Sequence, residues 1–277
     1  MIRSFAKNPN RDMSIAELAG YTAAIFAGLV IGLTGGGGSI LTVPIFVYLF
    51  HIQPIMATTY SLFVVGATSL VGSVEYAFKK KIDFTVTAAF AIPSFLSVFI
   101  TRRFLVPAMP DPLFRYHSFS FPKNESILFF FVFVMIMAAL AMLRQRNREE
   151  NDAGSPRLVL LALDGLGVGV LTGTIGAGGG FLIVPMLVLL AGLPMQRAVA
   201  TSILIISVNS IVGFLGDLHR NDLNWPLLLK FTAFSMGGIV LGVYLSRFIP
   251  PILLKRSFGG LVLAVAVFIL VKELGNL

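Results

Sequence analysis

The chain has 277 residues, of which 56% are hydrophobic and only 12% are charged, and its mean hydropathy is +0.89. Soluble domains carry about 25% charged residues on average, so this composition excludes a water-soluble globular protein. The formal net charge of +8 would suit a nucleic-acid partner, but basic residues also concentrate in the cytoplasmic loops of membrane proteins. We favour that second explanation and expect no nucleic-acid partner. Because cysteine is absent, disulfides and thiolate metal sites are excluded as well.

Long stretches of the chain carry no charge at all. A helix that crosses a bilayer needs about 20 apolar residues. Lys, Arg, Asp and Glu are all absent from residues 18–50, 55–74, 84–101 and 165–196. Residues 1–14 are polar and basic, and they lack the short apolar core and cleavage site of a removable signal peptide. We therefore predict an N-terminal cytoplasmic segment over 1–14, followed by membrane-spanning helices.

From residue 15 onward the chain holds two sets of five apolar segments. The first set lies in a predicted transmembrane repeat over 15–143, a polar linker covers 144–157, and the second repeat covers 158–271. The predicted segments are 15–33, 40–50, 56–77, 84–105 and 126–143, then 158–174, 181–192, 196–215, 226–246 and 252–271. The second segment of each set is too short to span a bilayer. The expected fold is an all-α polytopic membrane protein with two internal repeats. It has about eight transmembrane helices and two short re-entrant half-helices at Gly-rich breaks.

The two sets align with each other when the chain is shifted by 141 positions. Residues 28–72 then match residues 169–213 at 15 of 45 positions without a gap. The matches include glycines at 28, 32, 35, 37 and 38 on glycines at 169, 173, 176, 178 and 179. Apolar bias alone can align Leu with Val, but it cannot align five glycines, a proline and two serines. The sequence therefore predicts an internal duplication.

The distribution of Lys and Arg gives a prediction of topology. If the short segments are re-entrant, 13 of the 21 basic residues lie on the cytoplasmic side, whereas full crossing divides them 10 against 11. The positive-inside rule therefore favours eight spans, both termini cytoplasmic and parallel repeats of four spans each. This topology places Arg102 and Arg103 on the outer side of the membrane. Five spans per half would give inverted repeats, and that alternative stays open.

The Gly-rich breaks are the first candidate site. Consecutive glycines before a short helix leave N–H groups without intrahelical partners, and an anion can satisfy those groups at the positive end of the helix dipole. Two such breaks meeting in the membrane would form one anion-binding cradle. The candidate residues are Gly35, Gly36, Gly37, Gly38 and Ser39, with Gly176, Gly178, Gly179 and Gly180. The alternative is tight helix packing, which suits the GxxxG pairs Gly28/Gly32 and Gly169/Gly173 better.

Polar residues in the apolar segments are the next candidates. Hydroxyl and amide groups could donate to an anion, although Ser and Thr in membrane helices often bond only to their own backbone. The candidates are Thr59, Ser61, Thr201, Ser202 and Asn209. Ionisable residues inside a membrane are usually functional, so Asp164, Arg197 and Glu75 are candidates for gating or coupling. For Glu75 an interfacial ion pair with the nearby lysines is the simpler expectation, and Arg197 and Lys230 can instead extend to the headgroups.

Enzyme chemistry finds no support in the sequence. The histidines His51, His117 and His219 are scattered and do not have metal-ligand spacing. No HExxH, GxSxG or Walker A motif occurs, so an ATP-driven pump is also disfavoured. We expect no catalytic residues, metal site or cofactor, and transport driven by a gradient.

The duplicated pattern resembles the TauE/SafE sulfite exporter family. The pattern is a Gly-rich run followed by Pro44 or Pro185, then an Ala/Thr/Ser stretch over 57–61 or 198–202. The resemblance covers about 16–271 and implies a multi-pass secondary transporter of the bacterial cytoplasmic (inner) membrane. Its expected substrate is sulfite or a small organosulfur or carboxylate anion. The family motif falls on 35–39, 176–180, 59–61 and 201–202, and the copies differ at Ser39/Gly180 and Tyr60/Thr201.

Three functions remain open from the sequence. The first is a gradient-driven transporter, which the resemblance suggests to be an exporter, with a small anion and the lipid bilayer as its partners. The second is a passive anion channel that uses the same cradle. The third is a membrane scaffold that transports nothing. The identity of the anion, the coupling ion and whether the chain forms a homodimer are not determined by the sequence.

Overall fold

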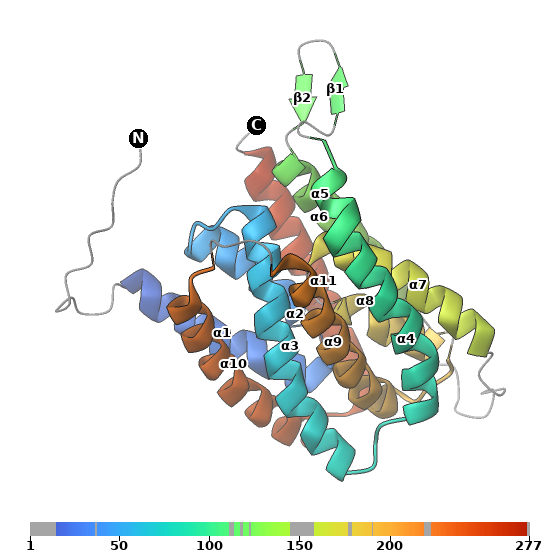
Figure 1. Ribbon diagram of the computed structural model, residues 1–277. Helices are drawn as coiled ribbons and strands as arrows, with labels where there is room; N and C mark the ends of the chain where they lie inside the picture. The colour runs from blue at the N-terminus through green and yellow to red at the C-terminus, as the bar shows by residue number, and fades with distance from the viewer. Residues whose placement is uncertain are drawn as a thin grey trace.

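The computed structural model describes residues 15–36, 38–110, 114–116, 119–121, 123–144, 158–176, 179–189, 191–218 and 223–275. The described part of the chain is almost entirely helical (Figure 1). In the first half the elements are α1 (Ile15–Thr34), α2 (Ser39–Pro44), η1 (Ile45–Leu49), α3 (Pro54–Phe78), α4 (Phe84–Ile100), η2 (Thr101–Leu105), α5 (Val106–Ala108), β1 (Phe114–Tyr116), β2 (Phe119–Phe121) and α6 (Lys123–Arg144).

The second half repeats this order of helices. Its elements are α7 (Leu158–Ile175), α8 (Gly180–Leu189), α9 (Met195–Asp217), α10 (Trp225–Leu245), η4 (Ser246–Phe248) and α11 (Pro251–Leu274). All ten predicted segments are helices, and the short helices α2 and α8 follow the two Gly-rich breaks. The antiparallel β1–β2 hairpin before α6 is a small departure from the all-α prediction.

Many of these helices have the length and composition of membrane spans. Within the described residues six helices qualify, over Pro54–Phe78, Phe84–Ala108, Leu158–Ile175, Met195–Asp217, Trp225–Phe248 and Ile252–Glu273. Shorter apolar helices cover Leu18–Thr34, Ile40–Leu49 and Glu125–Ala141. Large apolar side chains such as Val159, Phe248 and Val271 are exposed on their surfaces. In water these side chains would be unfavourable, but they suit contact with lipid.

Equivalent residues begin equivalent helices. The Asp83 side chain accepts a hydrogen bond from the Val86 N–H at the start of α4, and the Asn224 side chain accepts one from the Leu227 N–H at the start of α10. Asp and Asn are favoured at this position because their oxygens satisfy an N–H that has no partner in the first helical turn. The two capping residues are 141 positions apart, which is the shift that aligns the two halves.

The long helices of the two halves are packed in exchanged pairs. α1 of the first half packs against α10 of the second, and α7 of the second half packs against α4 of the first (Figure 1). A Cβ added at Gly28 would overlap the carbonyl oxygen of Ser235. At the equivalent Gly169 it would lie 2.5 Å from the carbonyl oxygen of Ser94. These contacts require glycine and confirm the packing role predicted for the GxxxG pairs.

Helices α3 and α9 lie side by side at the centre and run antiparallel. Thr59, near the start of α3, bonds to Asp217 at the end of α9, and Ser207 donates to the Gly66 carbonyl at mid-helix. Thr201, near the start of α9, accepts from the Asp83 N–H just beyond the end of α3. Because the alignment equates α3 with α9, the parallel relation favoured by the positive-inside rule is wrong for this pair. The antiparallel crossing is the relation that inverted repeats require.

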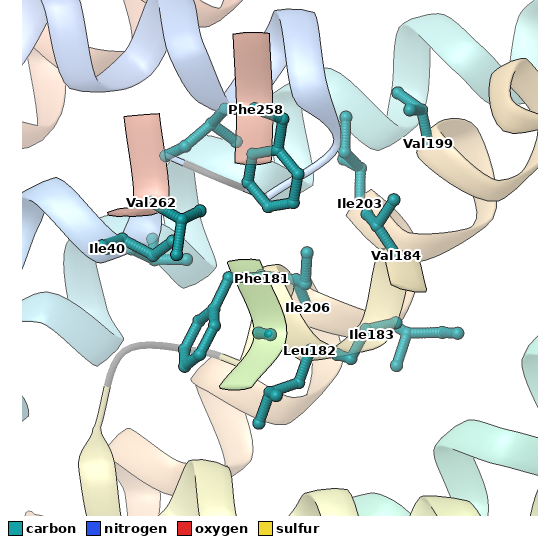
Figure 2. Packing of buried hydrophobic residues seen from close by; sticks show 14 of the residues in the cluster. Ile40, Phe181, Leu182, Ile183, Val184, Val199, Ile203, Ile206, Phe258 and Val262 are labelled. Carbon is teal, nitrogen blue, oxygen red and sulfur yellow. The ribbon is translucent and has the colours of Figure 1, made fainter. Parts of the chain in front are cut away.

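The apolar core surrounds the two short helices. Ile40 of α2 and the run from Phe181 to Val184 of α8 lie among side chains of α9 and α11 (Figure 2). Ile203 and Ile206 of α9 and Phe258 of α11 are fully buried in this cluster. The short helices are therefore enclosed by the longer helices. The sequence predicted that they are apolar but not what surrounds them.

Candidate functional site

The two Gly-rich breaks meet backbone to backbone at the centre of the molecule. A Cβ added at Gly36 would lie 2.6 Å from the Cα of Gly180, and one added at Gly180 would lie 2.5 Å from the Cα of Gly36. Both positions also contact the end of the Ile206 side chain, which lies midway along α9. Such an approach is possible only because neither residue has a side chain. Gly37 and Gly178, which the sequence also predicted for this site, lie outside the described residues.

Positive backbone angles explain why other glycines are needed here. The φ angles are +77° at Gly35, +140° at Gly36, +73° at Gly176 and +71° at Gly179. L-residues with a side chain rarely adopt these angles. Gly35 and Gly176 end α1 and α7, with their N–H groups bonded to the carbonyls four residues earlier. The chain therefore turns sharply at each break before α2 or α8 begins.

The first break is surrounded by uncharged groups. Ser202 donates to the Gly35 carbonyl over 2.6 Å and also lies 2.8 Å from the Val199 carbonyl. A Cβ added at Gly35 would lie 2.7 Å from the Val199 Cα. Nearby, the Tyr76 hydroxyl donates to the Gly32 carbonyl over 3.3 Å. This end of the site thus offers hydroxyl groups and backbone, with no formal charge among these contacts.

The second break lies against a buried ion pair. Arg102 and Asp217 are both 0% exposed, and Arg102 Nη1 lies 3.1 Å from Asp217 Oδ2. The same nitrogen donates to Thr58 over 3.1 Å, and Thr59 donates to Asp217 Oδ2 over 2.7 Å. A Cβ added at Gly176 would overlap Arg102 Nη2 and the Thr58 side chain. The guanidinium therefore rests directly on the bare backbone of the second break.

The structure separates Arg102 from Arg103, which the topology prediction grouped together on the outer side of the membrane. Arg103 is exposed, whereas Arg102 is completely buried. Counting basic residues on each side of the membrane does not distinguish a buried side chain from an exposed one. In fact α4 continues as the π-helical turn η2 through Leu105, so the two side chains point in different directions.

Sequence reasoning also missed Asp217, and it did not single out Thr58 within the Ala/Thr/Ser stretch over 57–61. One signal was available: on the 141-residue shift Arg102 is opposite Val243, Asp217 is opposite Tyr76, and Thr58 is opposite Val199. Positions where the two copies differ in charge, or where a hydroxyl faces an apolar residue, mark places where the two halves have different roles. The predictions compared identities between the copies and did not use these differences.

The predicted hydroxyl and amide residues take several different partners. Ser61 shares a short hydrogen bond with Thr42 of α2, and Thr201 accepts from Asp83. Asn209 donates its amide to Ser94 over 2.7 Å, while its side-chain oxygen is buried without a partner among the described residues. Thr59 and Ser202 thus touch the breaks or their ion pair, whereas Thr201 and Asn209 link α9 to α4. Gly38 packs against α1, and nothing is described of the Ser39 side chain.

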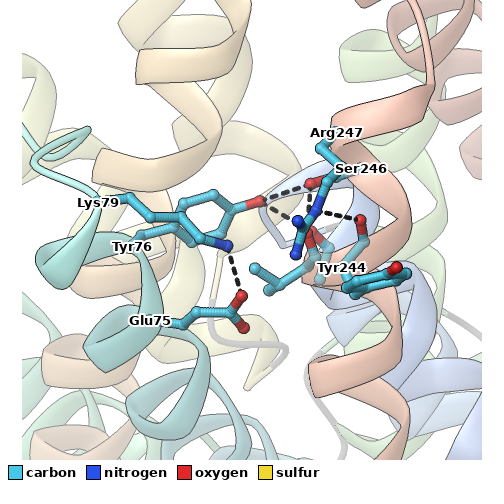
Figure 3. A network of polar contacts seen from close by, with 8 residues as sticks. Glu75, Tyr76, Lys79, Tyr244, Ser246 and Arg247 are labelled. Carbon is cyan, nitrogen blue, oxygen red and sulfur yellow. Dashed lines mark hydrogen bonds and ion pairs between the residues drawn. The ribbon is translucent and has the colours of Figure 1, made fainter.

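The ionisable candidates are less closely tied to the breaks. Glu75 forms an ion pair with Lys79 at the end of α3, which is the interfacial pair that was expected (Figure 3). Arg197 and Lys230 are exposed. Asp164 in α7 has one buried carboxylate oxygen without a partner among the described residues. Figure 3 also shows Tyr76 reaching Ser246 at this end of the bundle, with an oxygen-to-oxygen distance of 3.1 Å.

Comparison with known proteins identifies the class of this chain. Residues 21–269 match the model of the sulfite exporter TauE/SafE family, so the chain belongs to that family of membrane transporters and is not an enzyme. It is 27% identical to a probable membrane transporter protein of Xylella fastidiosa (strain 9a5c), over 90% of this chain and 93% of that protein. It is 29% identical to the probable membrane transporter protein YunE of Bacillus subtilis, over 80% and 86% of the two chains. No solved structure matches the chain.

Proposed function

We propose that this protein is a secondary transporter that exports a small anion, such as sulfite, an organosulfonate or a related carboxylate. The anion binds where the two Gly-rich breaks meet, and a proton or ion gradient drives its movement. The protein acts in the cytoplasmic (inner) membrane. The family description supports this choice of substrate class.

The close approach of Gly36 to Gly180 is the observation that carries the proposal. Gly36 and Gly180, which are 144 positions apart in the sequence, are in contact beside the middle of α9, and a buried guanidinium lies against Gly176 at the start of the second break. Bare backbone and a positive charge are the groups that bind anions in a water-poor site. A scaffold protein has no need for either feature at its centre.

We further propose that 15–143 and 158–271 are inverted repeats. The exchanged packing of α1 on α10 and α7 on α4, together with the antiparallel α3 and α9, supports this relation. In inverted-repeat transporters the substrate site lies between the repeats, and alternating access comes from movement of one part against the other. We therefore propose that the substrate site is the crossing of the two breaks.

Flux into or out of proteoliposomes tests the proposal. Purified protein should move at least one of sulfite, sulfoacetate, thiosulfate and acetate, and an imposed pH or ion gradient should drive its accumulation. Absence of flux for the whole panel would reject the transporter. Flux that no gradient can drive uphill would instead favour the passive channel, which uses the same site.

A matched pair of glycine variants tests the location of the site. Gly180→Ala should abolish flux because the new methyl group would lie 2.5 Å from the Cα of Gly36 and would push the two breaks apart. Gly167→Ala is the control, since no atom lies within 4 Å of the added Cβ. Equal flux in both variants would show that the anion binds elsewhere.

A further inference from the structure

We propose that Arg102 is the charged group that binds the transported anion, and that Asp217 is an internal anion that occupies Arg102 between transport events. This inference rests on the proposed function and makes it more specific. It assigns the anion to the side of the second break, next to Gly176. A guanidinium at this place also suits the sulfite, sulfonate and carboxylate anions of the proposed function.

The first argument is that the fold does not need these charges. A buried ion pair in a membrane protein is expensive, and well-packed uncharged residues of similar size are often at least as stabilising. The equivalent positions in the other half are Val243 and Tyr76, both buried, in the same exchanged arrangement of helices. Because one half of the molecule is built without the pair, Arg102 and Asp217 are present for a purpose other than packing.

The second argument is the geometry of the pair. Asp217 accepts from both Arg102 and Thr59 through the single oxygen Oδ2, and its Oδ1 has no partner among the described residues. The strongest pairing between a carboxylate and an arginine has two parallel hydrogen bonds, one to each carboxylate oxygen. The observed pairing therefore uses only part of the capacity of Asp217, which suits a partner that has to be released.

The third argument is what surrounds the guanidinium. Arg102 lies between the Thr58 hydroxyl and the backbone of Gly176, and Thr59 is adjacent on the same helix. An oxyanion that replaced the carboxylate would receive bonds from the guanidinium and from Thr59. The planar fork matches anions with two neighbouring oxygens, such as sulfite, sulfonates and carboxylates, and it does not match chloride in the same way.

Complete burial of the pair means that the structure is a state in which Arg102 is closed to solvent. Both side chains are 0% exposed, so no anion in water can reach Arg102 in this arrangement. Binding then requires a conformation in which the helices around the pair separate. With Asp217 in place, Arg102 keeps a counter-ion when no substrate is bound, which lowers the cost of returning empty through the membrane.

Binding measurements on purified full-length protein test the exchange of anions. Ligand-induced thermal stabilisation would be recorded with sulfite, sulfoacetate, acetate and chloride at constant ionic strength. Asp217→Asn removes the internal competitor, so the apparent Kd for sulfite should fall by about tenfold or more. Chloride should show no comparable gain. An unchanged or higher Kd in Asp217→Asn would overturn the proposal.

A double variant separates binding from folding. Arg102→Gln with Asp217→Asn leaves no uncompensated charge, so it should fold, yet it should lose the sulfite response and about 100-fold of the flux. Arg103→Gln removes the adjacent exposed charge and should behave as wild type. Wild-type flux in a folded double variant would overturn the role of Arg102, whereas absence of flux in the wild type would reject the proposed function itself.

Discussion

The two Gly-rich breaks begin with the same backbone turn but face different chemistry. Gly35 and Gly176 have φ angles within a few degrees of each other, at +77° and +73°. Each packs on the same position of the other half, Gly35 on Val199 and Gly176 on Thr58. Only Gly176 has a guanidinium against it. The duplicated scaffold thus supplies this first turn twice and the charge once, so the anion site we propose is asymmetric. The sequence had already predicted a difference between the two copies, at Ser39/Gly180 and Tyr60/Thr201.

The largest expected difference in the free energy of unfolding is between substitutions at the equivalent positions 217 and 76. Asp217→Ala leaves the buried Arg102 without its carboxylate, and breaking a buried pair costs about 3–5 kcal/mol. Tyr76→Phe removes one hydroxyl that bonds Gly32 and Ser246, which costs about 1 kcal/mol. Denaturant unfolding in detergent micelles would measure both. Equal losses would show that the chemical difference between the two ends has no energetic consequence.

The glycine contacts should behave alike in the two halves. Gly28→Ala and Gly169→Ala each force a methyl group onto a backbone carbonyl of the partner helix. Overpacking of this kind costs about 1–3 kcal/mol, and we expect the two losses to agree.

Gly167→Ala is the control for this pair, because its added Cβ meets nothing within 4 Å. Alanine is favoured over glycine within helices, so stability should stay the same or rise by up to about 1 kcal/mol. A loss at Gly167 as large as at Gly169 would mean that helix geometry, and not the contact between α7 and α4, explains the effect.

The smallest effect is expected at the exposed ion pair. The side chains of Lys79 and Glu75 are 34% and 32% exposed, so solvent screens their attraction. Glu75→Gln should cost less than about 1 kcal/mol, and the loss should shrink as salt is added. Unfolding at low and high salt would measure it. A salt-independent loss of several kcal/mol would place this pair in the same class as Arg102 and Asp217.

Local features of the fold were predictable from the sequence because they depend on nearby residues. Apolar segments gave the helices, and the glycine spacing gave the tight contacts at Gly28 and Gly169. Pairings between distant segments were not predictable in this way. Arg102 meets Asp217 across 115 positions, and nothing local distinguishes it from the exposed Arg103 next to it. The direction of α9 relative to α3 likewise depends on how many segments cross the membrane, and counting basic residues favoured the wrong alternative for this pair.

The exchanged packing of the halves has a consequence for biosynthesis. Ala24 of α1 meets its partner Ser235 only 211 residues further along the chain. When the ribosome has completed the first half, the glycine face of α1 still has no helix to cover it. The face of α4 that packs against α7 is likewise uncovered until α7 has been synthesised. Tight assembly must therefore follow synthesis of the second half, and the two halves made as separate polypeptides should reach a stable state only when both are inserted in the same membrane.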